Sequence, residues 1–511
     1  MRSRYDVVVI GGGHNGLVAA SYLARAGRSV LVVERSGRLG GATVSEAPFD
    51  GVDAQLSRYA YLVSLLPHWI VAELGLRFET RRRRIASYTP VPGSDTAVLV
   101  DTEDVARTRA SLERATGDAA AFDAWEQFYD RVAHVARAVF PTMLEPLPTR
   151  EQLRERVGDD ETWEALFERP LGEVIEATFK DDVVRGIVHT DALIGTFASA
   201  RDGDLRQNRC FLYHVIGNGT GAWDVPVGGM GALTDELVRC AAAAGAELAT
   251  GAEATAIEGD ATRAEVRFNG RAVACDDVVA ACAPVVLDGL LGRPLFESPE
   301  GAQLKVNMLL SRFPQLRDPS VPAEEAFAGT FHVNETYAQL EAAYEDASDG
   351  LVPSPVPCEI YCHSLTDPSI LGPGVEAHTL TLFALQMPAR LFEAGGDALA
   401  REALAATLRS LDSVLAEPIE DCLLRTPAGE PCLEFKTPLD LERELALPRG
   451  NIFHRDLAWP FAEDEIEAGT WGTETGIANV HLGGAGARRG GGVSGIPGRN
   501  AAMAILRAGG S

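Results

Sequence analysis

The 8 cysteines of this 511-residue chain include no C-x-x-C pair; they lie at positions 210, 240, 275, 282, 358, 362, 422 and 432. The sequence therefore lacks both a disulfide framework and the spacing of a zinc site, and we expect no metal. Free cysteines are typical of a reducing compartment, so we expect a cytoplasmic protein. The sequence also lacks a run of 18 apolar residues and a signal peptide, which excludes a transmembrane segment.

Positive charge is scarce as well. Lys and Arg number 46 against 73 Asp and Glu, for a net charge of −27, so a nucleic-acid partner is excluded and a small-molecule substrate is expected. The one dense basic run is Arg81 to Arg84. We interpret it as a solvated face; the alternative is a peripheral contact with a membrane surface, from which a lipid-like substrate would be collected. The oligomeric state stays open.

A βαβ unit is predicted at the start of the chain. Residues 5–10 (YDVVVI) and 29–34 (SVLVVE) are short β-branched runs typical of buried parallel strands, and residues 17–27 between them have helical spacing. Gly27 lies where that helix should end. A strand–helix–strand order of this kind predicts a parallel sheet with its connecting helix on one face.

The turn between the first strand and the helix has the spacing Gly11-x-Gly13-x-x-Gly16. Glycines there allow the backbone to approach a pyrophosphate, and the helix N-terminus offers unpaired N–H groups to the anion. Glu34 ends the second strand, 18 residues after Gly16, where a carboxylate accepts hydrogen bonds from an adenosine ribose. Together these features predict a dinucleotide site.

The rest of the chain alternates in character. Residues 66–224 contain charged, helix-prone stretches such as 121–140, whereas α/β patterns return at 229–257 and a Gly-rich turn and helix occupy 479–510. We therefore expect an α/β fold in which a Rossmann-like domain is assembled from discontinuous segments, with an inserted α+β substrate-binding domain. The segments expected for the first domain are 1–65, 225–300 and 450–511, and those for the second are 66–224 and 301–449.

FAD is favoured over NAD by a second pair of glycines. Arg35, Gly40 and Gly41 follow Glu34 in an E-R-x-x-x-x-G-G pattern that resembles FAD-binding oxidoreductases. Near the C-terminus, Ser494 is a candidate N-cap and Pro497 a candidate first-turn residue of a last helix, whose dipole would stabilise a reduced flavin. Gly217 to Ala222 repeats the nucleotide spacing without a helix after it, so we expect no second site and no NAD(P).

The chain as a whole resembles the phytoene-desaturase-like FAD-dependent oxidoreductases, in the branch that contains pyridine nucleotide-disulfide oxidoreductase domain-containing protein 2. The matching runs are VIGGGHNGLVAASYLARAG (9–27), ERSGRLGGATV (34–44), YLVSLLP (61–67), TDALIG (190–195), GAWDVPVGGMGAL (221–233), LKVNMLL (304–310), GNIFH (450–454) and GGAGARRGGGVSGIPGRNAA (483–502). The resemblance implies FAD, the fold of the flavin amine oxidases and oxidation of an apolar C–C or similar bond. The cofactor residues it implies, together with those above, are Gly11, Gly13, His14, Asn15, Gly16, Glu34, Arg35, Gly40, Gly41, Ala254, Gly486, Gly492, Val493 and Ser494.

The resemblance also points to two catalytic candidates. Lys305 interrupts an apolar strand and would hold a water beneath the flavin; the alternative is a lysine on an exposed edge. Arg488 stands where the family often has a neutral ring, so it would pair with a substrate anion or with the reduced flavin.

Three further residues are expected in the substrate pocket: His214, Trp223 and Asp191. His189 and Asp191 would form a catalytic dyad only if their segment were extended; the alternative for Asp191 is a cap or turn residue.

Hydride transfer to flavin needs orientation and electrostatics more than a nucleophile, and no nucleophile motif is present. We therefore expect an FAD-dependent dehydrogenase or desaturase that transfers a hydride from a largely apolar substrate to flavin N5. The alternatives are an amine or amino-acid oxidase on the same scaffold, and a lipid-handling binder without enzymatic activity.

Overall fold

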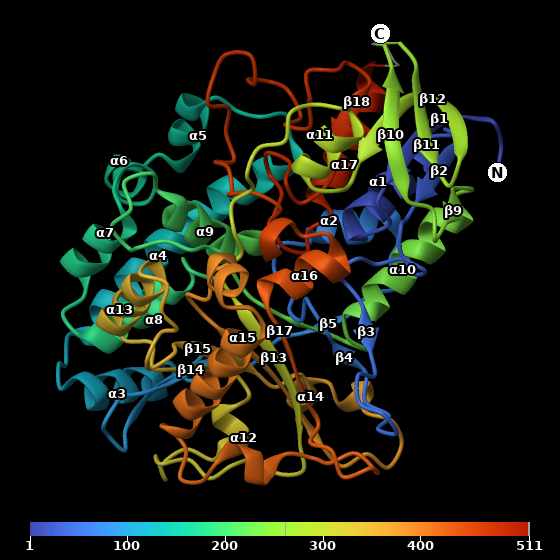
Figure 1. The fold of residues 1–511 in the computed structure, drawn as a ribbon. Helices are drawn as coiled ribbons and strands as arrows, with labels where there is room; N and C mark the ends of the chain where they lie inside the picture. The colour runs from blue at the N-terminus through green and yellow to red at the C-terminus, as the bar shows by residue number, and fades with distance from the viewer. Residues whose placement is uncertain (261, 509–511) are drawn as a thin grey trace.

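The computed structural model describes residues 1–260 and 262–508. Within them, two seven-stranded sheets lie on either side of the molecule's centre, and a bundle of helices flanks the second sheet (Figure 1). The first strand, β1, and the last helix, α17, both belong to the part of the fold built on the first sheet. This arrangement confirms the predicted α/β fold class.

The first sheet has a parallel centre with strand order β18-β12-β1-β2-β9, and β10 and β11 extend β12 as an antiparallel ribbon. The centre strand β1 pairs Val8 with Leu31 on one side and with Val278 on the other. The β2 strand is buried throughout, and β12 is buried over residues 278–280, as predicted for a sheet covered on both faces. The strands are β1 (Arg4–Ile10), β2 (Val30–Val33), β9 (Glu247–Ala249), β10 (Ala254–Gly259), β11 (Ala264–Phe268), β12 (Arg271–Ala280) and β18 (Val480–Leu482).

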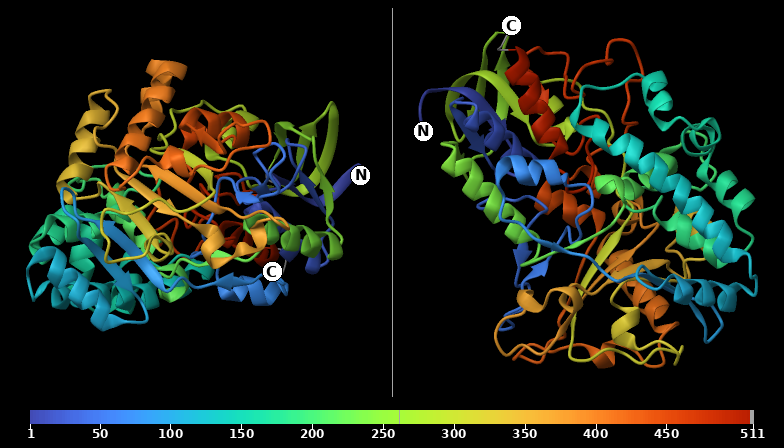
Figure 2. Two further views of the ribbon diagram at one scale, coloured as in Figure 1. Left: turned by 90° about the horizontal axis from the view of Figure 1, so that it is seen from below. Right: turned by 180° about the vertical axis from the view of Figure 1, so that it is seen from behind.

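Three helices from distant parts of the chain pack beside this sheet: α1 (His14–Arg25), α10 (Met230–Ala243) and α17 (Ile496–Ala508) (Figures 1 and 2). Helix α1 contacts both of the others. A Cβ at Gly498 of α17 would lie 1.9 Å from the carbonyl oxygen of Asn15, so the two helices touch backbone to backbone. The C-terminal helix thereby reaches the first turn of α1, where the cofactor motif lies.

The second sheet is mainly antiparallel, in the order β17-β13-β16-β15-β14-β6-β7. Its strands are β6 (Ile85–Pro90), β7 (Ala97–Asp101), β13 (Leu304–Leu310), β14 (Thr330–Val333), β15 (Cys358–Tyr361), β16 (His378–Ala384) and β17 (Leu433–Lys436). The strands of this sheet come from two stretches of the chain, residues 85–101 and 304–436, which precede and follow β9 to β12 in the sequence. Strands β6 and β7 lie within residues 66–224, where the sequence predicts helices. They are too short to be predicted from the sequence pattern.

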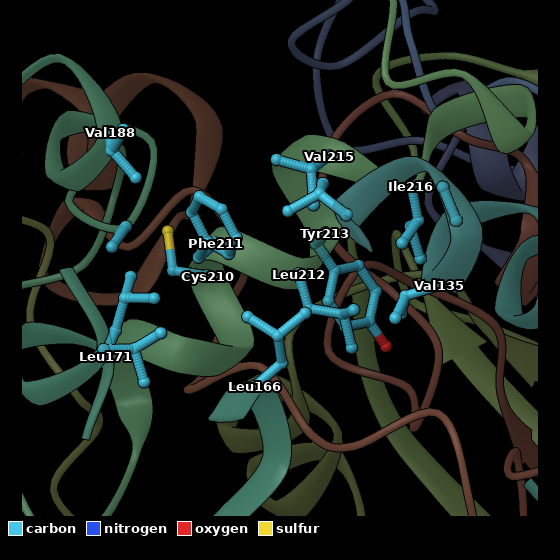
Figure 3. Close-up of a cluster of buried hydrophobic side chains, with 14 of the residues drawn as sticks. Val135, Leu166, Leu171, Val188, Cys210, Phe211, Leu212, Tyr213, Val215 and Ile216 are labelled. Atoms are coloured by element: carbon cyan, nitrogen blue, oxygen red, sulfur yellow. The ribbon is translucent and has the colours of Figure 1, made fainter. Parts of the chain in front are cut away.

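Helices α2 to α9 follow one another between residues 68 and 215, and most of them form the helical region. Figure 3 shows its core around α9, where Phe211, Leu212 and Val215 pack against Leu166, Leu171 and Val188. The helices are α2 (His68–Leu74), α3 (Val105–Thr116), α4 (Ala121–Val139), α5 (Arg150–Val157), α6 (Asp160–Trp163), α7 (Leu171–Thr178), α8 (Asp182–Thr190) and α9 (Arg206–Val215).

The remaining elements are helices, most of them around the second sheet, and short connecting strands. The helices around the second sheet are α12 (Ala323–Ala326), α13 (Tyr337–Ser348), α14 (His363–Thr366), α15 (Ala389–Asp412) and α16 (Pro438–Leu445). Helix α11 (Pro284–Leu290) instead packs beside β10 of the first sheet. The short strands are β3 (Ser45–Glu46), β4 (Leu56–Ser57), β5 (Thr80–Arg81) and β8 (Val225–Pro226).

Candidate active site

A cavity of about 1250 Å³ extends from the glycine turn of the first sheet to the face of the second sheet. Gly13, Glu34 and Ala254 line one end of it, and Lys305 and Asp191 line the other. The cavity therefore joins the predicted dinucleotide site to the predicted substrate pocket.

The glycine turn leaves the N-terminus of α1 open. Gly13 is the N-cap residue and provides no side-chain cap, so the first N–H groups of the 12-residue helix face the cavity without a side-chain acceptor. Gly11 has φ +102°, which favours glycine, and a Cβ at Gly16 would lie 2.0 Å from the Gly11 carbonyl oxygen. Only glycine fits at Gly16, and the turn is shaped to bring a pyrophosphate to the helix end.

Glu34 is fixed at the end of β2 by local hydrogen bonds. Its Oε2 accepts from the backbone N–H of Gly12 (2.7 Å), and its Oε1 accepts from the N–H of Ser36 (2.9 Å). Each carboxylate oxygen can accept more than one hydrogen bond. Because Glu34 also lines the cavity, it remains available to the hydroxyls of a ribose.

The second glycine pair lies against the first. The N–H of Gly40 donates to the carbonyl of Gly12 (2.8 Å), and Gly41, with φ +58°, lines the cavity. The guanidinium of Arg35 also lines the cavity and donates to the carbonyl of Glu444 (3.1 Å). Two loops thus approach the same end of the cavity, as the E-R-x-x-x-x-G-G pattern predicts.

The C-terminal glycine run adds a third backbone segment to this end. Gly492 and Val493 line the cavity, and Ser494 Oγ accepts from the N–H of Ile496 (3.3 Å) at the start of α17. Nearby, His14 is buried, which lowers its pKa to about 4, and its Nε2 has no partner among the described residues. A neutral imidazole with an unused ring nitrogen is a ready hydrogen-bonding group for a bound ligand.

The residues present fit FAD. The cofactor candidates that line the cavity are Gly11, Gly13, His14, Asn15, Glu34, Arg35, Gly41, Ala254, Gly492 and Val493. The other four shape the backbone behind them: Gly16 contacts Gly11, Gly40 packs beside Thr234, Gly486 packs on Pro284, and Ser494 caps α17.

Lys305 lies in β13, between β17 and β16, and is only 2% exposed, so the interpretation as an exposed edge lysine is wrong. Its Nζ donates to the carbonyls of Tyr59 (2.7 Å) and Ser57 (3.4 Å). Burial holds its pKa well below the usual range. Lys305 lines the cavity, so an amine whose pKa is lowered by burial lies at the cavity wall.

A polar wall continues from Lys305 along the second sheet, and no sequence motif predicts it. Lys305 Nζ lies 5.6 Å from the ring centre of Tyr61, whose ring is 4.4 Å from that of Tyr361. The hydroxyl of Tyr361 donates to Glu359 Oε2 (2.5 Å), and the Arg83 guanidinium lies 5.5 Å from the Tyr361 ring. All of these residues line the cavity.

His214, Trp223 and Asp191 all line the cavity. The rings of His214 and Trp223 stack at 5.1 Å, and the indole N–H donates to the His214 carbonyl (3.0 Å). The dyad of His189 and Asp191 is wrong, because residues 182–190 are helical and His189 points to Glu341 (3.4 Å).

The structure does not place Arg488 at the cavity, where a catalytic residue is predicted. Its guanidinium pairs with Glu463 (2.8 Å) and Glu467, and it is not one of the cavity's lining residues. Two carboxylates already neutralise this guanidinium, so it is not available to pair with a substrate anion or a reduced flavin. The structure therefore gives no support to a catalytic role for Arg488.

The basic run divides between surface and cavity. Arg81 lies 3.7 Å from Asp367, Arg82 lies 3.6 Å from Asp224 and Arg84 pairs with Asp101 (2.8 Å). Arg83 is the least exposed of the four and lies at the polar wall, and the exposed Arg82 also lines the cavity. The interpretation of the whole run as a solvated face is wrong at Arg83.

The second glycine run, Gly217 to Ala222, forms a short 3₁₀ turn and a loop after α9. No helix follows it to receive a phosphate, and Gly221 and Ala222 line the cavity beside Trp223. Among the helices of the described ranges, none is both long and apolar enough to cross a bilayer.

A profile of the flavin-containing amine oxidoreductases matches residues 16–313, more than half of the chain. The chain is 48% identical to an uncharacterized protein of Mycobacterium tuberculosis, over 98% of this chain and 97% of that protein. It is 30% identical to the mouse pyridine nucleotide-disulfide oxidoreductase domain-containing protein 2, over 99% and 94% of the two chains.

Among solved structures, a variant of putrescine oxidase superposes with a TM-score of 0.61 at 17% identity, covering 99% of both chains. This likeness shows a shared fold. Combined with the profile match and the fit of the dinucleotide end of the cavity, it means that the chain is an FAD-containing oxidoreductase and belongs to the flavin-containing amine oxidoreductase family.

Proposed function

We propose that the protein is a dehydrogenase that removes two hydrogens from a largely apolar organic substrate. The observation that carries this proposal is the continuous cavity, which would place a substrate on the second sheet beside a dinucleotide held by the first. When bound, FAD supplies the acceptor for a hydride and its two electrons. The chain's own task is to bind the substrate, orient it and exclude water.

Apolar and aromatic side chains from several elements support the choice of substrate. Leu62, Val132, Ile187 and Ile194 line the cavity along with the stacked pair of His214 and Trp223. Surfaces of this kind bind carbon skeletons by burial and leave orientation to a few polar groups. Lys305 and the polar wall are the groups that would provide that orientation.

An amine oxidase is the second candidate, and one feature favours it. Asp191 and Glu359 bring carboxyl groups to the substrate end of the cavity, where a substrate cation would find a partner. The putrescine oxidase fold accommodates this chemistry in another protein. The proposal of a binder without activity is dropped, because the family assignment makes the chain an oxidoreductase.

One experiment separates the two candidates. The purified holoenzyme is mixed without oxygen with limonene, as an apolar probe, or with putrescine, as a cationic one, and the visible flavin band is followed. We expect bleaching with apolar hydrocarbons and none with amines. Bleaching by amines alone would replace the dehydrogenase by an amine oxidase, and no bleaching by a wider panel of either class would contradict both.

A further inference from the structure

Asp191 lies at the substrate end of the cavity, and its carboxyl group has no hydrogen-bond partner among the described residues. It follows the last turn of α8 and lines the cavity. Its backbone carbonyl is contacted by the Cys210 thiol (3.6 Å), which fixes the main chain there. An anchored residue with a free carboxyl group in a cavity is suited to act on a ligand.

The position of α8 is set by close backbone packing. A Cβ at Gly186 would lie 1.8 Å from the carbonyl oxygen of Glu335, so the helix touches the turn after β14 directly. Next to Asp191, Thr190 Oγ1 donates to Glu359 Oε1 (3.0 Å). These contacts hold the end of α8 against β15 and place Asp191 beside the polar wall.

The surroundings make Asp191 an unusually strong base. Burial, followed by the nearby charge of Glu359, raises its pKa to about 8. Other titratable or charged groups in this region come from several neighbouring segments: Tyr61, Arg83, Tyr129, Cys210, His214, His332, Glu335 and Tyr361. Because carboxyl groups outnumber the one guanidinium there, proton uptake by the cluster is favoured.

The same cluster holds three groups that resemble metal ligands. The ligand atoms of His332, Glu335 and Glu359 lie within 4.8 Å of one another. However, both Glu359 oxygens accept hydrogen bonds, His332 Nδ1 bonds to Thr89 Oγ1 (2.8 Å), and Glu335 is not among the residues that line the cavity. Burial raises the pKa of Glu335 well above its usual value, so a proton is the cation that this cluster favours.

We propose that Asp191 is a catalytic base, which takes from the substrate the proton that dehydrogenation releases. This inference rests on the proposed function. Two C–H bonds break on adjacent atoms: one leaves as a hydride with its electron pair, and the other leaves as a proton while its electron pair forms the new double bond. The hydride and its two electrons are accounted for by FAD, so the chain must supply the acceptor for the proton. The carboxylate of Asp191 forms the new O–H bond and later releases the proton through the cavity.

The first test needs no substrate. Infrared spectra of the holoenzyme are recorded across about pH 5 to 10, and wild type is compared with Asp191→Asn. We expect a carboxylic-acid band that disappears with a midpoint near pH 8 and is absent from the variant. A wild type with no such band would overturn the proposal, whatever the outcome of the substrate screen.

The second test uses a probe that bleaches the flavin. Asp191→Asn should slow anaerobic flavin reduction by about 100-fold or more, while FAD stays bound and Asp191→Glu recovers part of the rate. The wild-type rate should rise with pH through the same midpoint, because only the carboxylate accepts a proton. Glu126→Gln, on the exposed face of α4, is the control and should change nothing.

An unchanged rate in Asp191→Asn would overturn the proposal while leaving the dehydrogenase assignment intact. Metal content and the effect of a chelator are measured on the same samples. A stoichiometric metal ion, or a rate lost on chelation, would also overturn it, since the cluster would then be a metal site.

Discussion

Glu34 is the side chain that we expect to decide cofactor binding. Both of its oxygens are oriented by backbone N–H groups, and it faces the cavity beside the open end of α1. Glu34→Arg would replace the acceptor for the ribose hydroxyls by a cation and break the bond to Gly12. We expect the variant to release FAD on dilution, measured as loss of yellow colour from the protein fraction.

The matched control for this variant is Glu258→Arg, on the exposed end of the ribbon strand β10. It makes the same change of charge away from the cavity and should keep full colour. Retention of FAD by Glu34→Arg would show that Glu34 does not bind the ribose.

Lys305 allows a second prediction at the residue scale. Lys305→Met keeps most of the side-chain volume and removes the ammonium group, so the packing of β13 should survive. If Lys305 lies beside the flavin, as the family resemblance implies, reoxidation by oxygen should slow by roughly tenfold, about 1.4 kcal/mol of barrier. Stopped-flow traces would show the slower phase, with FAD still bound.

The neighbouring strand offers the control. Lys436 is the register partner of Lys305 on β17 and pairs with Glu444 (2.6 Å). Lys436→Met should leave reoxidation unchanged. Equal rates in wild type and Lys305→Met would place Lys305 away from the oxygen reaction; a quinone acceptor then shows whether oxygen is the acceptor at all.

Residues could be predicted from the sequence where their partners are local. The glycine turn and Glu34 lie within one strand–helix–strand unit, so spacing alone brings them together. Arg83 and Glu359 are brought to one wall only by the pairing of β6 with β14 and of β14 with β15. The available signal, an arginine run in an acidic protein, predicts a surface position for all four members and is wrong for Arg83, which lies at the polar wall.

At the scale of elements, two close backbone contacts set the positions of two helices that line different ends of the cavity. Gly16 sets α1 against the first strand, and Gly186 sets α8 against the turn at Glu335. A methyl group at either position would collide with a carbonyl oxygen and force the helix away. The consequences should differ because only α1 carries the dinucleotide end of the cavity.

We therefore expect Gly16→Ala to lose FAD and to lower the free energy of unfolding by about 1–3 kcal/mol. Gly186→Ala should lose similar stability but retain FAD, while its flavin reduction slows with the displacement of Asp191. Gly203→Ala, where a Cβ meets no neighbour within 4 Å, is the control. Denaturant titrations and flavin absorbance measure both effects, and identical behaviour of the two variants would contradict this division of roles.

Elements could be predicted where hydrophobic patterns are long and pure. Strand β2 and residues 7–10 of β1 are apolar runs, and α1 has its apolar residues at helical spacing. Strands β6 and β7 are short, and they sit among helices in the sequence, so their role in the second sheet depends on pairing that the sequence does not display. Helix α8 begins where Asp181 caps it by accepting from the N–H groups of Val183 and Val184. It ends at Asp191, which is its C-terminal cap residue, one of the roles that the sequence suggested for Asp191.

At the scale of the whole molecule, the buried carboxyl group of Asp191 links stability to pH. Its pKa in the folded protein is about 8, above the usual aspartate value of 3.8. Between these two pH values, the folded state therefore holds a proton that the unfolded state has lost. The stability that this proton contributes is fully present below pH 3.8 and falls as pH rises, until it is gone at about pH 8. The slope is about 1.4 kcal/mol per pH unit between these limits.

Asp191→Asn removes this dependence while keeping the shape of the side chain. We expect the free energy of unfolding of wild type, relative to the variant, to fall steadily with pH and to level off above about pH 8. The comparison is made at saturating FAD, because cofactor loss would add its own change in stability. Other groups, such as the arginine-paired carboxylates, titrate equally in both proteins, so the difference isolates Asp191. A difference that stays constant with pH would mean that Asp191 is ionised throughout, and the strong base inferred at the end of α8 would be absent.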